Sequence, residues 1–315
     1  MSTDATSSKP SAFFRAIYEQ PYLLLILTTL AWGGNAVASR MAVGEISPML
    51  LTAGRWSLVL AIVGVMGRDA IVRNAPRLRE QWRTILAMAV CGFTAFNALF
   101  YVAGHLTSAV NIAILQGSIP IFVMLGALVL HRTPVRPGQA LGMLITLAGV
   151  LTVASHGDLA GLAQLQFNPG DVLMILACVL YAGYTLALRG REGVSTLWFF
   201  AGLAAAALAT SLPLAAGELA LGQGQWPSWR GWAILLYVAL APSFFAQLFY
   251  MRAVQLIGPA RAGLFVNLVP VFGALLAVLL IGEPFRAHHA AALALVLLGI
   301  ALAETSARRA VSRTA

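Results

Sequence analysis

Charged residues are scarce in this sequence, in which Asp, Glu, Lys and Arg together make up 10% of 315 residues. Soluble domains carry roughly 25%. Hydrophobic residues make up 60% of the chain, and its mean hydropathy is +0.84. A single aqueous core cannot bury so much apolar surface. The composition therefore excludes a soluble globular protein and indicates an all-α polytopic membrane protein.

Cysteine is nearly absent, and motifs for covalent chemistry are missing. The two cysteines, Cys91 and Cys178, lie in separate hydrophobic runs without a metal-binding spacing, which predicts free thiols, no disulfide and no metal site. No glycine-rich phosphate loop with its lysine occurs, and no Ser–His–Asp set stands out. We therefore expect no cofactor and no enzymatic activity. A channel or a sensory protein is the other alternative to a carrier.

Long apolar runs are abundant instead, and ten of them have about the 20 residues that a membrane-spanning helix needs. If the amino terminus is cytoplasmic, most of the 20 Lys and Arg residues fall on the cytoplasmic side, as the positive-inside rule requires. The formal net charge of +9 is then a topology signal, and no nucleic-acid partner is expected. The predicted spans are 22–41, 47–67, 84–103, 108–131, 136–154, 171–189, 195–217, 230–250, 260–281 and 287–305.

The second half of the chain repeats the first at an offset of 149–150 residues. "LAWGGNAVASR" at 30–40 aligns with "LYAGYTLALRG" at 180–190, and "FTAFNALFYVAG" at 93–104 aligns with "PSFFAQLFYMRA" at 242–253. "GSIPIFVMLGALVLHRTP" at 117–134 aligns with "NLVPVFGALLAVLLIGEP" at 267–284. Each half holds five spans. Because five is odd, the second half enters the membrane upside down, an arrangement typical of secondary transporters.

Short motifs at corresponding places carry a family resemblance. They are the Trp32-Gly33 pair, the Ala53-Gly54-Arg55 segment, Gly170-Asp171 and Gly282-Glu283-Pro284. With its ten spans in two inverted repeats, the chain resembles the EamA-type exporters of the drug/metabolite transporter superfamily over about residues 22–305. Within that branch it is most similar to the bacterial aromatic amino acid exporters. The resemblance implies alternating access around a central cavity in the bacterial inner membrane.

The expected organisation follows from the spans and the repeat. A lipid bilayer and a small-molecule substrate are the expected partners, both termini are expected in the cytoplasm, and the transporter is expected to function as a monomer. The segments are a cytoplasmic tail at 1–21, a first five-helix repeat at 22–154, a periplasmic loop at 155–170, a second five-helix repeat at 171–305 and a cytoplasmic tail at 306–315.

Polar and aromatic residues recur at helical spacing within the spans. Trp32 and Asn35 share a helix face, and Asn97, Tyr101 and His105 form a second stripe. Facing a central cavity is one interpretation, and interfacial anchoring or helix–helix contact is the other. The candidate substrate-binding residues are Trp32, Asn35, Asn97, Tyr101, His105, Gln116, Tyr181, Tyr184, Phe245, Tyr250 and Asn267.

The predicted cavity walls come from the first, third, fourth, sixth, eighth and ninth spans. The fifth and tenth spans carry few polar side chains and are expected at the periphery. Pro120 and Pro270 occupy equivalent positions in the two halves, which predicts kinks that act as hinges or cavity walls, with ordinary kinks as the alternative.

Arg55 is the one charged residue well inside a predicted span. It can bind a substrate carboxylate, or it can hold helices together. None of the 11 acidic residues lies near mid-membrane. The sequence therefore favours a neutral or zwitterionic substrate, such as an aromatic or bulky apolar amino acid, exported without carboxylate-based proton exchange. Efflux of cationic drugs is the alternative, and transport of phosphorylated sugars fits less well because an interior Lys is lacking.

Overall fold

The computed structural model describes residues 18–132, 135–157, 168–188, 196–257, 262 and 265–311, and every regular element within them is helical. The first half contains α2 (Pro21–Met41), α3 (Pro48–Met66), α4 (Arg68–Arg73), α5 (Ala75–Glu80), α6 (Trp82–Ala89), η1 (Val90–Ala95), α7 (Phe96–Leu106), α8 (Ala109–Gln116), α9 (Ile119–His131) and α10 (Pro137–Ala154). The second half contains α12 (Pro169–Ala187), α13 (Thr196–Ala220), α14 (Trp229–Val238), η2 (Ala239–Phe245), α15 (Ala246–Ile257), α17 (Val269–Ile281) and α18 (Ala287–Val311).

Eight helical stretches of the described chain are long and apolar enough to cross a membrane. Two shorter apolar helices, Pro137–Val153 and Val269–Ile281, lie where the fifth and ninth spans are predicted. The chain is thus an all-helical, multi-pass membrane protein. Ten spans remain a prediction at these two shorter helices.

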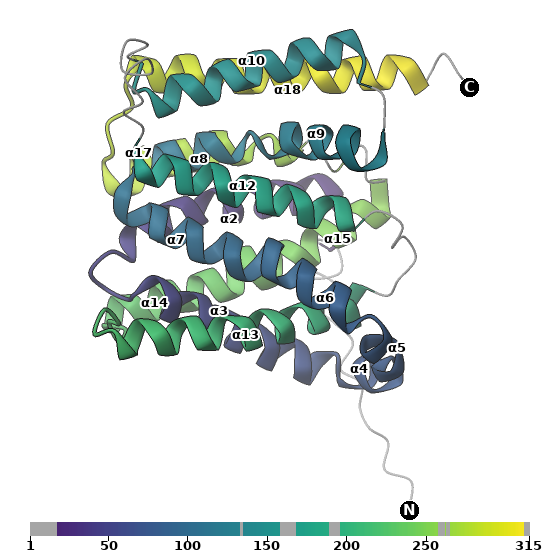
Figure 1. Cartoon of the computed structure of the whole chain (residues 1–315), viewed down its shortest axis with the longest axis vertical. Helices are drawn as coiled ribbons and strands as arrows, with labels where there is room; N and C mark the ends of the chain where they lie inside the picture. The colour runs from purple at the N-terminus through teal and green to yellow at the C-terminus, as the bar shows by residue number, and fades with distance from the viewer. Residues whose placement is uncertain are drawn as a thin grey trace, which may run out of the picture.

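The helices lie side by side, and their ends gather at two opposite faces of the molecule (Figure 1). The first face holds the start of α2, the end of α9 and the end of α18. The second face holds the end of α2, the end of α7 and the start of α18. In Figure 1 the helices run across the page, with the first face on the right and the second on the left.

A π-helix interrupts the third predicted span, and another interrupts the eighth. η1 separates α6 from α7, and η2 separates α14 from α15. π-helices are rare and occur frequently at functional sites. η2 contains Pro242, which has no N–H to donate to the carbonyl of Val238. The Ser243 hydroxyl donates a hydrogen bond to that carbonyl instead, so the local polar groups are satisfied.

Pro120 and Pro270 each begin a helix rather than bend a continuous one. Pro120 is the second residue of α9, and Pro270 is the second residue of α17. At the start of a helix, the missing N–H of proline costs no hydrogen bond. The N-cap residues of the two helices share one backbone geometry, with φ −78° and ψ −14° at Ser118 and φ −79° and ψ −14° at Leu268. The predicted kinks are therefore helix breaks in the structure.

Two glutamates tie helices together at the second face. The carboxylate of Glu218, in the last turn of α13, accepts hydrogen bonds from the Ser47 hydroxyl (2.6 Å) and from the backbone N–H of Met49 (3.2 Å) at the start of α3. The carboxylate of Glu283 accepts from the N–H groups of Ala109 (2.9 Å) and Val110 (3.0 Å) at the start of α8. Carboxylates at helix N-termini satisfy unpaired donors and complement the helix dipole.

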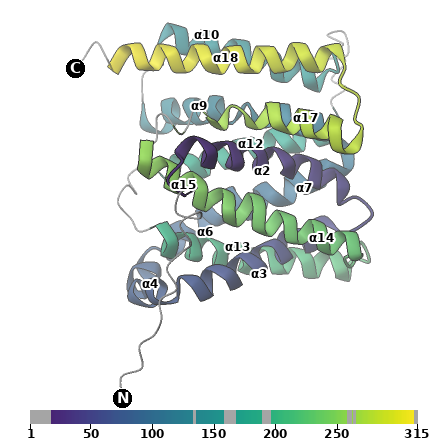
Figure 2. The ribbon, with the colours of Figure 1, turned by 180° about the vertical axis from the view of Figure 1, so that it is seen from behind.

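α10 and α18 pack against each other as an outer layer at one end of the long axis (Figures 1 and 2). Their backbones approach closely because both helices present glycine at the contact. A Cβ atom on Gly299 would lie 2.6 Å from the carbonyl oxygen of Gly142 and 2.7 Å from the backbone nitrogen of Thr146. Neither backbone atom can move aside without separating the helices.

Replacing Gly299 by alanine is expected to lower the melting temperature of the purified protein. The clash with backbone atoms costs about 1–3 kcal/mol, which exceeds the gain of about 1 kcal/mol from helix propensity. Gly183→Ala in α12 is the matched control, because a Cβ there meets nothing within 4 Å. Thermal unfolding in detergent, followed by size-exclusion chromatography, measures both variants. A Gly299→Ala protein as stable as Gly183→Ala contradicts the close α10–α18 contact.

Candidate functional site

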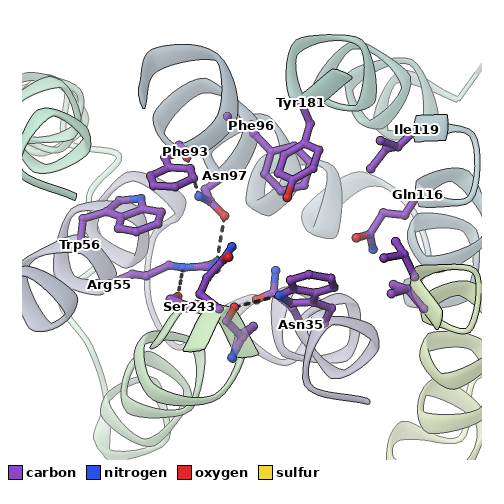
Figure 3. A pocket seen from close by; sticks show the side chains of 16 residues that line it. Asn35, Arg55, Trp56, Phe93, Phe96, Asn97, Gln116, Ile119, Tyr181 and Ser243 are labelled. Atoms are coloured by element: carbon purple, nitrogen blue, oxygen red, sulfur yellow. Dashed lines mark hydrogen bonds between the residues drawn. The ribbon is translucent and has the colours of Figure 1, made fainter. Parts of the chain in front are cut away.

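A cavity of about 110 Å³ lies among the middle parts of the helices (Figure 3). α10 and α18 contribute no residue to it, in agreement with their predicted peripheral position. α3 is not among the predicted walls, but it contributes Arg55 and Trp56. The lining residues are Trp32, Asn35, Arg55, Trp56, Gly92, Phe93, Phe96, Asn97, Gln116, Ile119, Tyr181, Pro242, Ser243, Gln247, Val266 and Val269.

Arg55 of α3 extends into this cavity and is only 6% exposed. Its Nε donates a hydrogen bond to the hydroxyl of Ser243 in η2 (2.5 Å). Its Nη1 donates to Oδ1 of Asn97 (2.8 Å) and to the hydroxyl of Tyr101 (2.5 Å), both in α7. Tyr101 in turn donates to Oδ1 of Asn35 in α2 (3.2 Å). A single guanidinium therefore links four helical elements.

The guanidinium keeps donors free for a ligand. Its Nη2 makes no hydrogen bond with the described residues, although Nε and Nη1 do. Among the described residues, no aspartate or glutamate lines the cavity. A buried cation without a counter-charge is costly. The arrangement can therefore accept one carboxylate or a similar anion.

Aromatic rings form much of the remaining wall. Trp56 stacks on Phe93 with ring centroids 4.5 Å apart, and Phe96 packs against Tyr181 at 4.9 Å. The Trp32 indole donates from Nε1 to the carbonyl of Pro242 (3.0 Å), which fixes the orientation of its ring. Such surfaces favour apolar or aromatic groups of a ligand.

Gln116 of α8 adds an unsatisfied amide to the wall. Its Nε2 is sealed from solvent and has no hydrogen-bond partner. A buried donor without a partner costs about 1–3 kcal/mol. A ligand oxygen bound beside Gln116 would remove that cost.

The predicted site residues divide into those that line the cavity and those that do not. Among the candidates, Trp32, Asn35, Arg55, Asn97, Gln116 and Tyr181 line it. Tyr101 is buried beside it and contacts Arg55, and Tyr184 is buried against the Phe93 ring at 5.3 Å. Tyr250 reaches it only through the Trp32 ring, 5.5 Å away.

Three other candidates lie elsewhere. Phe245 is 44% exposed and packs on Phe244 and Phe249. Asn267 donates to Oε1 of Glu304 (3.1 Å), which joins it to α18. His105 lines a separate cavity at the second face.

Sequence reasoning missed Trp56, Phe93, Phe96 and Ser243. Two of them belong to the π-helices, Phe93 to η1 and Ser243 to η2. Helical spacing is an available signal for both, because Phe93 lies four residues before Asn97 and Ser243 lies four residues before Gln247, and all four line the cavity. Trp56 directly follows Arg55, and its position beside that arginine was the available signal.

Comparisons with known proteins agree with this architecture. The model of the EamA-like transporter family matches the chain twice, over residues 20–155 and 168–305. The uncharacterized transporter YyaM of Bacillus subtilis is 25% identical over 288 residues, which cover 89% of this chain and 92% of YyaM. An uncharacterized protein of Pseudomonas aeruginosa is 32% identical over 290 residues, which cover 89% of this chain and 93% of that protein.

A solved crystal structure is similar in fold. It matches with a TM-score of 0.64 and 23% identity over 92% of this chain and 98% of the solved chain. The two matches to the family model together span nearly all of the described helices. The chain belongs to the EamA-like transporter family.

Proposed function

We propose that this transporter exports amino acids with aromatic or bulky apolar side chains, and related metabolites, from the cytoplasm across the bacterial inner membrane by alternating access. The observation that carries the proposal is the environment of Arg55. The arginine has a buried guanidinium with a free Nη2 in an aromatic-lined cavity without an acidic residue among the described ones.

A zwitterion fits these charges better than a cation does. The carboxylate of an amino acid would pair with Nη2 of Arg55, and its ammonium would meet the side-chain oxygens of Asn35 or Gln116 and the aromatic faces. A permanent cation placed about 4 Å from the guanidinium would be repelled by about 4 kcal/mol at an effective dielectric constant of about 20. Efflux of cationic drugs is therefore the weaker alternative.

The size of the cavity fits a transport intermediate rather than a rigid receptor. Its volume of about 110 Å³ is small beside the roughly 300–1,000 Å³ of ordinary ligand pockets. A solute with an aromatic ring therefore requires the cavity to widen. The helix breaks before α9 and α17 and the two π-helices are places where the helices can adjust.

Several features support two inverted five-helix repeats. The family model matches each half separately. η1 and η2 occupy corresponding positions, as do the breaks before Pro120 and Pro270. Left-handed residues end the corresponding helices α9 and α17, with φ 50° at Arg132 and φ 66° at Gly282. We propose in addition that this symmetry relates two gates, that the transporter functions as a monomer and that both termini lie in the cytoplasm.

Trp32→Ala is expected to raise the KM for L-tryptophan or L-phenylalanine about fivefold while the protein still reaches the membrane. Loss of one aromatic contact is worth about 1 kcal/mol, which is roughly a fivefold change in affinity. Phe245→Ala is the matched control, because this ring also belongs to the η2 region but lies outside the cavity. Flux into proteoliposomes at subsaturating substrate measures the change. Equal KM values for the two variants would show that Trp32 serves packing alone.

Arg55→Gln is expected to lower the flux of L-phenylalanine at least tenfold and to remove the preference for L-phenylalanine over L-phenylalaninamide, which lacks the carboxylate. The glutamine loses the charge that the carboxylate requires. Ser243→Ala is the comparison variant, because it removes one bond to Arg55 and keeps the guanidinium. A competition assay with both ligands reads the preference directly. If Arg55→Gln still prefers the carboxylate form, another group recognises it.

Export is expected to proceed without a proton gradient, because no acidic residue lines the cavity. The measurement is L-phenylalanine flux in proteoliposomes with an imposed pH gradient and again after the gradient is collapsed by an ionophore. Similar initial rates are expected in both cases. Flux that stops without the gradient, or accumulation of substrate against its own gradient when one is imposed, makes the uncoupled mechanism wrong.

A further inference from the structure

A second and larger polar cavity, of about 490 Å³, lies at the second face of the molecule. It is formed where α2 and α7 end and where α8 and α18 begin. We call it the basic vestibule and define it by Arg40, His105, Asn111, His156, Arg286 and His288, all of which line it.

The vestibule concentrates basic side chains in a chain that has few charges. Four of the five histidines in the sequence line it, together with Arg40 and Arg286. Among the described residues, Glu283 is the one acidic residue that lines it, and both of its oxygens accept hydrogen bonds from the start of α8. Within the described residues neither arginine forms a salt bridge. Both arginines can therefore pair with an added anion, while the nearby carboxylates of Glu283 and Asp171 are held by other hydrogen bonds.

Two atoms at the vestibule are buried and have no hydrogen-bond partner in the described part of the chain. They are Oδ1 of Asn111 and Nε2 of His288. Asn111 is 2% exposed, and its Nδ2 is held by Thr107 (3.1 Å) and by the buried carboxylate of Asp171 (3.2 Å). Buried polar atoms in native proteins normally have a partner, so each of these atoms indicates a place for a ligand or its bound water.

The vestibule and the central cavity lie along the same helices. On α7, Asn97 lines the central cavity, His105 lines the vestibule, and Tyr101 lies between them on the same helix face with 1% exposure. α8 likewise contributes Gln116 to the central cavity and Asn111 to the vestibule. The packed layer that contains Tyr101 thus separates two polar cavities that lie along the same helices.

We propose that the basic vestibule is a second binding site, which holds the carboxylate of the exported solute after it passes Tyr101. Arg40 and Arg286 pair with the carboxylate, and His288 donates to it from Nε2. Asn111 accepts from the ammonium through Oδ1. Arg40 is already oriented, because its Nη1 donates to the carbonyl of Gly104 (3.1 Å) at the end of α7. This assignment rests on the proposed export of amino acids.

The binding test uses histidine-labelled protein in nanodiscs and follows the histidine signals by NMR. Sodium acetate is the probe for a carboxylate, sodium chloride is the ionic control, and inorganic phosphate is the competing anion. Acetate is expected to shift vestibule histidine signals saturably. His131, which ends α9 at the first face, is expected to stay unchanged.

The variant that tests the site carries Arg40→Gln and Arg286→Gln together, and it is expected to weaken the acetate response at least tenfold. Arg230→Gln is the matched control, because Arg230 also lies near the second face, is 65% exposed and does not line the vestibule. No acetate response in the wild type overturns the proposal. A response to phosphate at far lower concentrations than to acetate also overturns it and indicates a phosphate or lipid-headgroup site.

An export assay with the same proteins tests whether the vestibule lies on the transport path. The double variant is expected to export L-phenylalanine at least threefold more slowly than the wild type at an unchanged melting temperature. Acetate binding with unchanged export in the double variant overturns the role in export. Absence of amino acid flux in the wild type, with acetate binding intact, rejects the proposed function and supports a carboxylate site that serves another solute.

Discussion

A buried guanidinium in a membrane protein must be surrounded by acceptors, and the arrangement around Arg55 shows how far that requirement reaches. Its partners are Ser243, Asn97 and Tyr101, and Tyr101 extends the chain of hydrogen bonds to Asn35. These residues belong to α2, α3, α7 and η2, which come from both halves of the sequence. The helices must therefore meet at one point, and the space that remains beside that point is the central cavity. Nη2 of the guanidinium stays free there because no acidic side chain reaches it.

The two π-helices, η1 and η2, also help to surround Arg55 with polar and aromatic groups. η2 can hold Ser243 beside Arg55 because Pro242 frees the carbonyl of Val238, and the serine hydroxyl serves both groups by donating to that carbonyl and accepting from Nε. η1 turns Phe93 toward Trp56 while Asn97, four residues later, still reaches Nη1. The two π-helices thus supply an aromatic ring, Phe93, and a hydroxyl group, Ser243, to the wall of the cavity.

Much of this arrangement is predictable from the sequence, and the limits have physical causes. Apolar run length marks the spans because the bilayer sets the length of a helix, and the polar patch around Trp32 and Asn35 indicates the cavity because amides are costly in lipid. Periodicity fails at Phe245, which carries the same aromatic signal as Trp32 but is 44% exposed, because a sequence cannot show which side of a π-helix faces inward. Periodicity also groups His105 with Asn97, although they line different cavities. The face of one helix does not reveal that side chains of other helices pack around Tyr101 and separate the two spaces. The role of Ser243 depends on a contact with Arg55, 188 residues away, that no local pattern encodes.

In the proposed transport cycle, the same hydrogen bonds would connect substrate binding to movement. Any rearrangement that separates α3 from η2 breaks the bond between Arg55 and Ser243. A hydrogen bond to a charged group is worth about 1.5–3 kcal/mol, so this bond opposes such a movement in the empty protein. A substrate carboxylate at Nη2 would neutralise the guanidinium and lower that cost, whereas a neutral amine would leave it in place. A ligand shifts a conformational equilibrium only by its difference in affinity for the two states. Under the proposed function, the charge that would select a zwitterion is therefore also the charge through which its binding would favour the change of state.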